Sequence, residues 1–421
     1  MRKISAFISL ILLVSTLAQP QASAARVKSG ATCTKAGAIS TVANVKFTCI
    51  KSGKKLVWNS GVAVVKPSTP AATLTPAPTP TTAVTKFITP LAPTGPNPLT
   101  WQNIESRYSE ISSVAWQSVQ DTLKANSASG VTTSIKVIYA PNTPETHYPG
   151  FESYLRTGVQ MWNRFKLPKH STFLVYSYDE IPWAKTTIAK ILTDSGMSDK
   201  DAQATAENLS HAPYGGPDCG GANAGMISDT EGIGVFALCA RNEGVDPYYN
   251  GPLQIHEFTH QIQGAQFVGT KFNQQQVMPC WISEGLAHAG GLGAGSPTLN
   301  YYLEVRSRQA SHPVLNVAGG HASTQVDKST MTYDFLVKFY GESAPPGCFQ
   351  VPSYSLGYSA GLLTTEALSA IGGIESTLLL YSRAANGETF EEAFKNIYGI
   401  SWTEASDILA RVVSKEFAAL G

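Results

Sequence analysis

The chain has 421 residues and a formal net charge of only +1, from 31 Lys and Arg against 30 Asp and Glu. This balance hides a division, because residues 1–100 contain 11 Lys or Arg and no Asp or Glu. The other 20 basic and 30 acidic residues give 101–421 a net charge of −10, which argues against a nucleic-acid enzyme. A basic front and an acidic back predict at least two parts with different partners.

Residues 1–24 have the organisation of a secretory signal peptide. Arg2 and Lys3 precede an apolar stretch over 4–18, and Ala22-Ser23-Ala24 fits the small-residue cleavage rule. The alternative is a membrane anchor, for which the stretch is short, and no later segment is apolar enough to span a bilayer. We therefore expect a secreted protein, in which the six cysteines can form up to three disulfides.

Residues 25–65 contain seven Lys or Arg and two cysteines, Cys33 and Cys49, and predict a small β module. Because so short a module has only a small hydrophobic core, we expect a Cys33–Cys49 disulfide to stabilise it. It resembles Gly/Cys/Trp modules at the N-terminus of exported actinobacterial proteins, which implies attachment to an anionic cell-wall polymer. A solubilising spacer is the alternative. Residues 66–100 hold nine prolines and predict an extended linker.

From Trp101 onward the composition is that of a globular protein. The apolar spacing predicts helices over 101–126, 151–165 and 199–209 and strands over 133–139, 172–176 and 232–240. After these it predicts helices over 252–267, 279–290, 300–309, 329–341, 356–371, 374–385, 388–396 and 402–418. This pattern favours an α+β protein, with a mixed α/β lobe over 101–268 and a mainly helical lobe over 269–421.

The segment His256-Glu257-Phe258-Thr259-His260 carries the strongest chemical signal. Residues four apart share one face of a helix, so His256 and His260 can present two imidazole nitrogens to one metal. Glu257 can then reach a water molecule at that metal. This HExxH arrangement is typical of zinc sites with a carboxylate general base.

A catalytic zinc ion needs a third protein ligand and one open position. Gln263 and Gln266 occupy the places where the metzincin pattern requires Gly and His, so that pattern is excluded. Glu284 lies 24 residues after His260, within Trp281-Ile282-Ser283-Glu284-Gly285-Leu286-Ala287.

A Trp-x-x-Glu-Gly-x-Ala segment after HExxH resembles the gluzincin metallopeptidases. The resemblance covers residues 225–400 well and 101–224 only in general plan. It implies a zincin-like fold and one catalytic Zn²⁺ ion held by His256, His260 and Glu284, with Glu257 as the base.

Gluzincins also supply a Tyr or His that donates a hydrogen bond to the reacting carbonyl oxygen. A Tyr-x-x-Gly segment before an apolar helix ending at Gly372-Gly373 resembles their catalytic tyrosine region. Tyr358 fits the distance to these glycines better than Tyr354. His312 and His321 are weaker candidates.

The resemblance leaves other features of the site open. Thermolysin-like enzymes have an acidic residue four positions after the ligand Glu, where this chain has His288, and Asp334 and Glu366 are candidate replacements. The resemblance implies that the strand at 235–238 is an edge strand that pairs with extended substrate, and a core strand is the alternative. Pairing of neighbouring cysteines favours Cys219–Cys239 and Cys280–Cys348, although six cysteines allow fifteen connectivities.

The expected function is zinc-dependent hydrolysis of peptide or protein substrates. The Gly-x-Met-Glu-Asn element of the aminopeptidases is absent from the sequence, which disfavours that subclass. Two alternatives stay open, a non-catalytic surface protein built on a metallopeptidase scaffold and a zinc amidase acting on cell-wall peptides.

Overall fold

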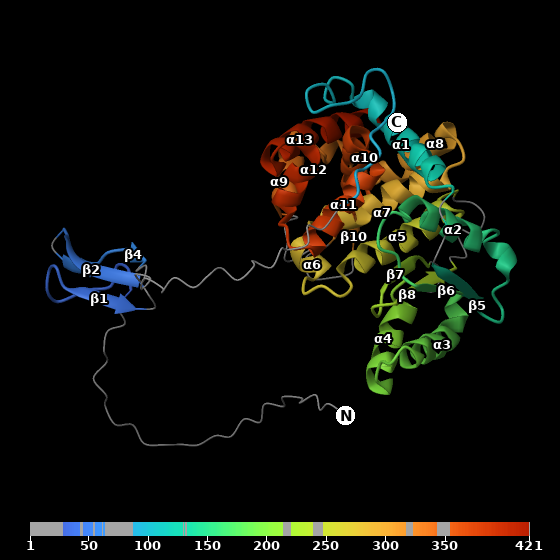
Figure 1. Cartoon of the computed structure of the whole chain (residues 1–421), viewed down its shortest axis with the longest axis horizontal. Coiled ribbons are helices and arrows are strands. Elements are labelled where there is room, and N and C mark those ends of the chain that lie inside the picture. Colours follow the sequence, from blue (N-terminus) through green and yellow to red (C-terminus); the bar gives the residue numbers. More distant parts are fainter. Residues whose placement is uncertain are drawn as a thin grey trace, which may run out of the picture. The chain divides into compact units, whose positions relative to one another are not determined.

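The computed structural model describes residues 28–42, 45–53, 55–60, 62–63, 87–128, 130, 133–213, 220–238, 247–316, 323–342 and 354–420. The chain divides into two compact units, Met1–Val84 and Thr85–Gly421 (Figure 1). The predicted signal peptide over 1–24 lies outside the described residues.

The first unit is a small antiparallel sheet. Its strand β2 (Val45–Ser52) pairs with β1 (Ile39–Val42), β3 (Lys55–Trp58) and β4 (Val62–Ala63). The predicted disulfide between Cys33 and Cys49 is confirmed, and Cys49 is buried. The disulfide ties the segment before β1 to the central strand, as expected for a module with so little core.

The second unit begins before the predicted domain boundary at residue 101. The backbone N–H of Leu91 donates to the Glu375 carboxylate, and Arg164 bonds both that carboxylate and the carbonyl oxygen of Thr89. Leu99 is buried in the core. The predicted linker over 66–100 is therefore wrong in its last part, because this stretch finds its bonding partners on the larger unit.

The second unit contains a four-stranded sheet. Its order is β5 (Ser134–Tyr139), β6 (His170–Tyr176), β8 (Glu231–Ala237) and β7 (Ala222–Met226). The first three strands are parallel, and β7 runs antiparallel to β8. The predicted edge position of the strand at 235–238 is wrong, because β8 is paired on both sides and β7 forms the edge.

Helices cover both faces of this sheet (Figure 1). Phe173 and Val175 of β6 face the main core with α2 (Phe151–Trp162) and α5 (Pro252–Phe267). The alternating residues Leu174 and Tyr176 pack with α3 (Ile181–Asp194) and α4 (Asp199–His211) in a second core. Burial on both faces explains why β6 and β8 are apolar along most of their length.

The rest of the second unit is mostly helical, which confirms the mixed α+β class. Its elements are α1 (Ile111–Ala125), α6 (Gln274–Val277), α7 (Cys280–Gly295), α8 (Leu299–Ala310), a hairpin of β9 (Val314–Asn316) and β10 (Ser323–Gln325), α9 (Tyr333–Glu342), α10 (Ala360–Gly372), α11 (Ile374–Ala385), α12 (Phe390–Tyr398) and α13 (Trp402–Ala419). The helix expected from residue 101 begins only at Ile111, whereas α3, β7 and the hairpin were not predicted. Within the described ranges, every helix is too short or too polar to cross a membrane.

A buried charged cluster joins α8, α10 and α13. The guanidinium of Arg306 donates to both carboxylate oxygens of Glu366 and to one oxygen of Glu416, the latter at 2.7 Å. Glu366 also accepts a hydrogen bond from the hydroxyl of Tyr302. One cation thus faces two carboxyl groups. Burial raises the pKa of Glu416 from 4.5 to about 8, so Glu416 holds a proton near neutral pH.

This proton makes the stability of the fold depend on pH. The folded state keeps the Glu416 proton that the unfolded chain, with its lower pKa, releases, so the stabilisation is complete below about pH 4.5 and is lost as pH rises toward 8. We expect the melting temperature of the wild type to fall more steeply from pH 5 to pH 8 than that of Glu416→Gln, which cannot ionise. Thermal unfolding followed by circular dichroism measures both slopes, and equal slopes would contradict the assignment.

Candidate metal centre

Two long buried helices carry the predicted ligand residues. Helix α5 holds His256, Glu257 and His260, and α7 holds Glu284. At the start of α5, the Gln254 side chain accepts the backbone N–H of Gly251, which satisfies a donor that a helix start leaves without a partner. Both histidines of α5 face Glu284 of α7.

The approach of α10 to α7 completes the site from a third direction. Gly285 and Gly361 lie at this crossing, where a Cβ atom on Gly285 would stand 2.3 Å from the carbonyl oxygen of Gly361. Only glycine permits this close helix contact. The contact sets the segment Tyr354–Tyr358, just before α10, against Glu284.

The three predicted ligands present their donor atoms as a nearly equilateral triangle. The Nε2 atoms of His256 and His260 are 3.1 Å apart, and Oε2 of Glu284 lies 3.3 Å from the first and 3.2 Å from the second. Bonds of 2.0–2.1 Å to a tetrahedral zinc ion place its ligand atoms roughly 3.3 Å apart. The spacing therefore fits a single tetrahedral metal ion.

The burial of these groups also fits a metal. His256 and Glu284 are almost fully buried, and apart from the two histidines Oε2 of Glu284 has no partner among the described residues. Among those residues, His256, His260 and Glu284 are the one group of His, Cys, Asp and Glu found suited to hold a metal ion. Two imidazoles and a carboxylate are ligands that zinc accepts in catalytic sites.

Glu257 lies beside the triangle without belonging to it. Its Oε1 is 3.9 Å from Nε2 of His256, and its Oε2 has no partner within the described ranges. Burial raises the pKa of Glu257 from 4.5 to about 8. A buried carboxyl group with a raised pKa beside a metal triangle can hold and release a proton there.

The two histidines differ in their electrostatic surroundings. Burial lowers the pKa of His256 to about 4. Burial also opposes the charge of His260, but the nearby Glu284 carboxylate outweighs it and raises the pKa of His260 to about 9. Without a metal, the site therefore holds a proton on His260 opposite Glu284, and a divalent cation would compete with that proton.

His288 and Tyr248 form ring contacts with His256. The His288 ring lies 4.6 Å from the His256 ring between centroids, and the Tyr248 hydroxyl lies 3.5 Å from Nδ1 of His288. Nδ1 of His256 has no hydrogen-bond partner among the described residues. His288, four positions after Glu284, thus contributes an aromatic contact to His256 in place of the expected acidic residue.

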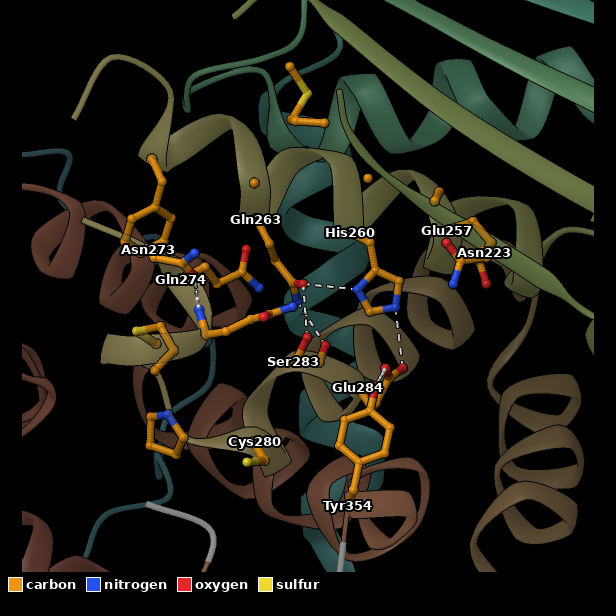
Figure 2. Close-up of a pocket in the computed structure, with 18 of the residues that line it drawn as sticks. Asn223, Glu257, His260, Gln263, Asn273, Gln274, Cys280, Ser283, Glu284 and Tyr354 are labelled. Atoms are coloured by element: carbon orange, nitrogen blue, oxygen red, sulfur yellow. Dashed lines mark hydrogen bonds and ion pairs between the residues drawn. The ribbon is translucent and has the colours of Figure 1, made fainter. Parts of the chain in front are cut away.

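The two candidate tyrosines occupy different places. The Tyr354 hydroxyl donates to Oε1 of Glu284 at 2.7 Å (Figure 2). The ring of Tyr358 stacks on His256 with 6.2 Å between centroids and is 38% exposed, so it faces the open side of the site. Tyr354 is therefore placed to orient Glu284. Tyr358 also interacts with Glu284, and its exposure places it to meet a ligand that enters.

A cleft of about 600 Å³ opens onto these residues. All five residues of β7 line one wall, among them the polar residue Asn223, and Phe267, Phe272 and Met278 contribute apolar surface. The remaining lining includes the neutral polar residues Gln263, Asn273, Gln274, Gln275 and Ser283. Apart from the carboxylates and histidine at the site, the described lining carries no charged side chain.

Several predicted residues do not reach the site. Asp334 is exposed on α9, and Glu366 pairs with Arg306 and Tyr302, so neither contacts a ligand histidine. These two predictions are wrong, because Asp334 faces solvent and Glu366 is bonded to other residues. His312 is exposed, its Nδ1 lies beside the Arg308 carbonyl oxygen, and it does not line the cleft. His321 lies outside the described residues.

The remaining cysteine predictions are only partly covered by the structure. Cys280, at the start of α7, is disulfide-bonded. Cys219, Cys239 and Cys348 lie outside the described residues, so the pairings Cys219–Cys239 and Cys280–Cys348 stay predictions.

The sequence interpretation missed the role of Gln263. Its side chain lies between His260 and Ser283 (Figure 2), although in the sequence it served only to exclude the metzincin pattern. Its position three residues after His260, on the same helix face, was the signal that could have identified it. The sequence also gave no indication that β7 would line the cleft.

No protein-family model, curated protein or solved structure matches this chain.

Proposed function

We propose that this chain is a secreted zinc metallopeptidase of gluzincin type, with a zincin-like fold. The observation that carries the proposal is the triangle of His256, His260 and Glu284 donor atoms, with edges of 3.1–3.3 Å and the Glu257 carboxyl group beside it. A structural helix pair has no need of three donors, two of them on buried residues, at the spacing of tetrahedral zinc.

In this proposal each side chain at the site has one role. His256, His260 and Glu284 would hold the zinc ion, which when bound lowers the pKa of water and polarises a carbonyl group. Glu257 takes a proton from the attacking water, for which its Oε2 is free of hydrogen bonds to the described residues. Tyr358 donates its hydroxyl hydrogen to the oxygen that gains negative charge. Tyr354 holds Glu284 in its orientation.

The cleft supports an extended peptide as the substrate. β7 is paired only with β8 in the described sheet, and the whole strand lines the cleft beside the ligand residues. A peptide can add to such an edge by backbone hydrogen bonds, which leave its alternate side chains to meet the walls. Because the described walls away from the ligands are uncharged, uncharged peptide side chains suit them best.

Metal analysis and peptide cleavage test the proposal together. We expect the purified protein to contain about one zinc ion per chain and to cleave members of a peptide library. A chelator should abolish the cleavage and added zinc should restore it. A protein that binds no zinc, or that binds zinc and cleaves no peptide or amide bond, would contradict the proposed activity.

The two alternatives predict different results in the same experiment. A non-catalytic scaffold would bind zinc and leave the library intact, whereas a zinc amidase would cleave cell-wall peptides in preference to ordinary ones. The retained carboxyl group of Glu257 favours an enzyme, since a scaffold has no need of a base.

The first unit is proposed to attach the protein to an anionic cell-wall polymer. Lys28, Lys35, Lys46, Lys51 and Lys55 are all exposed on it, and residues 1–100 contain no acidic side chain. The salt dependence of binding to purified cell wall tests this attachment, because salt screens attraction between charges.

A further inference from the structure

The amide group of Gln263 connects the two helices that carry the ligand residues. Its Oε1 lies 2.9 Å from Nδ1 of His260 on α5, and its Nε2 donates to the backbone carbonyl of Ser283 on α7 at 2.8 Å. Ser283 directly precedes Glu284, and its hydroxyl also donates to Oε1 of Gln263 at 3.4 Å. Gln263 is fully buried, so water does not compete for these bonds.

The backbone carbonyl of Ser283 fixes the orientation of the amide. A carbonyl oxygen only accepts hydrogen bonds, so the group that faces it must be the NH₂ of Gln263. The amide oxygen then faces His260 and also only accepts, so Nδ1 of His260 must carry a hydrogen. In neutral His260, the lone pair is consequently on Nε2, which lies 3.2 Å from Oε2 of Glu284.

We propose that Gln263 is a positioning residue for the metal centre. Gln263 sets the tautomer of His260 and holds the His260 ring in register with Glu284. This inference rests on the proposed zinc site. Metal-ligating histidines commonly donate their second ring N–H to a neighbouring acceptor, which orients the ring and strengthens metal binding. In this chain the acceptor is itself bonded to the helix that supplies the third ligand. The contact therefore couples two ligands through one side chain.

Gln266 provides a matched control on the same helix. It is also a buried glutamine, and its amide donates to the carbonyl oxygens of Lys166 and Ile262 and accepts from the hydroxyl of Ser382. It thus bridges elements as Gln263 does, but its bonds do not involve His256, His260 or Glu284. Replacing Gln266 by Met removes a similar set of bonds at a distance from the proposed metal site.

The test compares the zinc affinities of full-length variants by competition with a chromophoric chelator. We expect Gln263→Met to weaken zinc binding by about 10–100-fold, because a thioether replaces the acceptor at His260. Gln263→Glu keeps an acceptor at His260 and should recover part of the affinity. Gln266→Met should keep wild-type affinity, even if the melting temperatures of both metal-free Met variants fall.

The outcomes separate this inference from the proposed function. Wild-type affinity in Gln263→Met, or an equal loss in Gln266→Met, would overturn the positioning role while leaving the zinc site intact. A wild type without zinc affinity would overturn both. If the wild type binds zinc but cleaves no peptide, the peptidase proposal fails, and the affinity comparison still decides the role of Gln263.

Discussion

Glu257→Gln is expected to lower peptide hydrolysis by about 10²–10⁴-fold while the protein still binds one zinc ion per chain. The substitution preserves the shape of the side chain but replaces the carboxyl group that would accept the proton of water. Glu257 is not one of the triangle's three donors, so its loss should leave the ligand set unchanged. Initial rates on a cleaved library peptide and zinc content of the same preparation measure both quantities.

A surface substitution of the same kind provides the control for Glu257. Glu304 lies exposed on α8 in a pair with Arg308, so Glu304→Gln makes the same chemical change away from the cleft. It should keep the wild-type rate. Full activity of Glu257→Gln would exclude the proposed base, and loss of zinc from that variant would assign Glu257 a role in metal binding instead.

The helices were predictable from sequence where local signals coincide with tertiary packing. The helix predicted at 402–418 is α13, which Ser401 begins by accepting the backbone N–H of Glu404. The helix predicted at 388–396 begins two residues late, at the capping box of Thr389 and Glu392. In both cases the apolar face and the capping residue identify the same helix.

The sheet was less predictable because strand position depends on partners far away in sequence. Residues 222–226, Ala-Asn-Ala-Gly-Met, have no alternation of large apolar side chains, yet they form β7 by pairing with β8. The resemblance implies an edge position for β8, and the apolar sequence of this strand does not reveal that it has a neighbour on both sides. Helix α3 was missed despite apolar residues at helical spacing, Ile181, Ala184, Ile188 and Leu192.

The candidate ligands could be predicted from the sequence for a geometric reason. His256 and His260 lie one turn apart on one helix, and Glu284 lies on the next long helix, so few contacts are needed to bring them together. The contacts that surround the ligand residues could not be predicted in this way. The bond of Gln263 to Ser283 and the stacking of Tyr358 on His256 depend on how α5, α7 and α10 cross.

That crossing leads to the second prediction of large effect, the substitution of Gly285 by Ala. A Cβ atom at Gly285 would lie 2.3 Å from the carbonyl oxygen of Gly361 and 2.4 Å from its carbonyl carbon. Both are backbone atoms, so α10 must move away as a body. Overpacking of this kind costs about 1–3 kcal/mol, or more where the backbone cannot adjust. We expect a clear fall in the melting temperature of the metal-free protein.

Gly341→Ala distinguishes this effect from the general consequences of replacing a helical glycine. A Cβ atom at Gly341, on α9, would meet nothing within 4 Å, so alanine there should be neutral or should stabilise the helix by up to about 1 kcal/mol. Equal melting temperatures for Gly285→Ala and the wild type would show that the α7–α10 contact can yield. Because Glu284 adjoins Gly285 and Tyr358 leads into α10, separation of these helices should also weaken zinc binding, whereas Gly341→Ala should leave it unchanged.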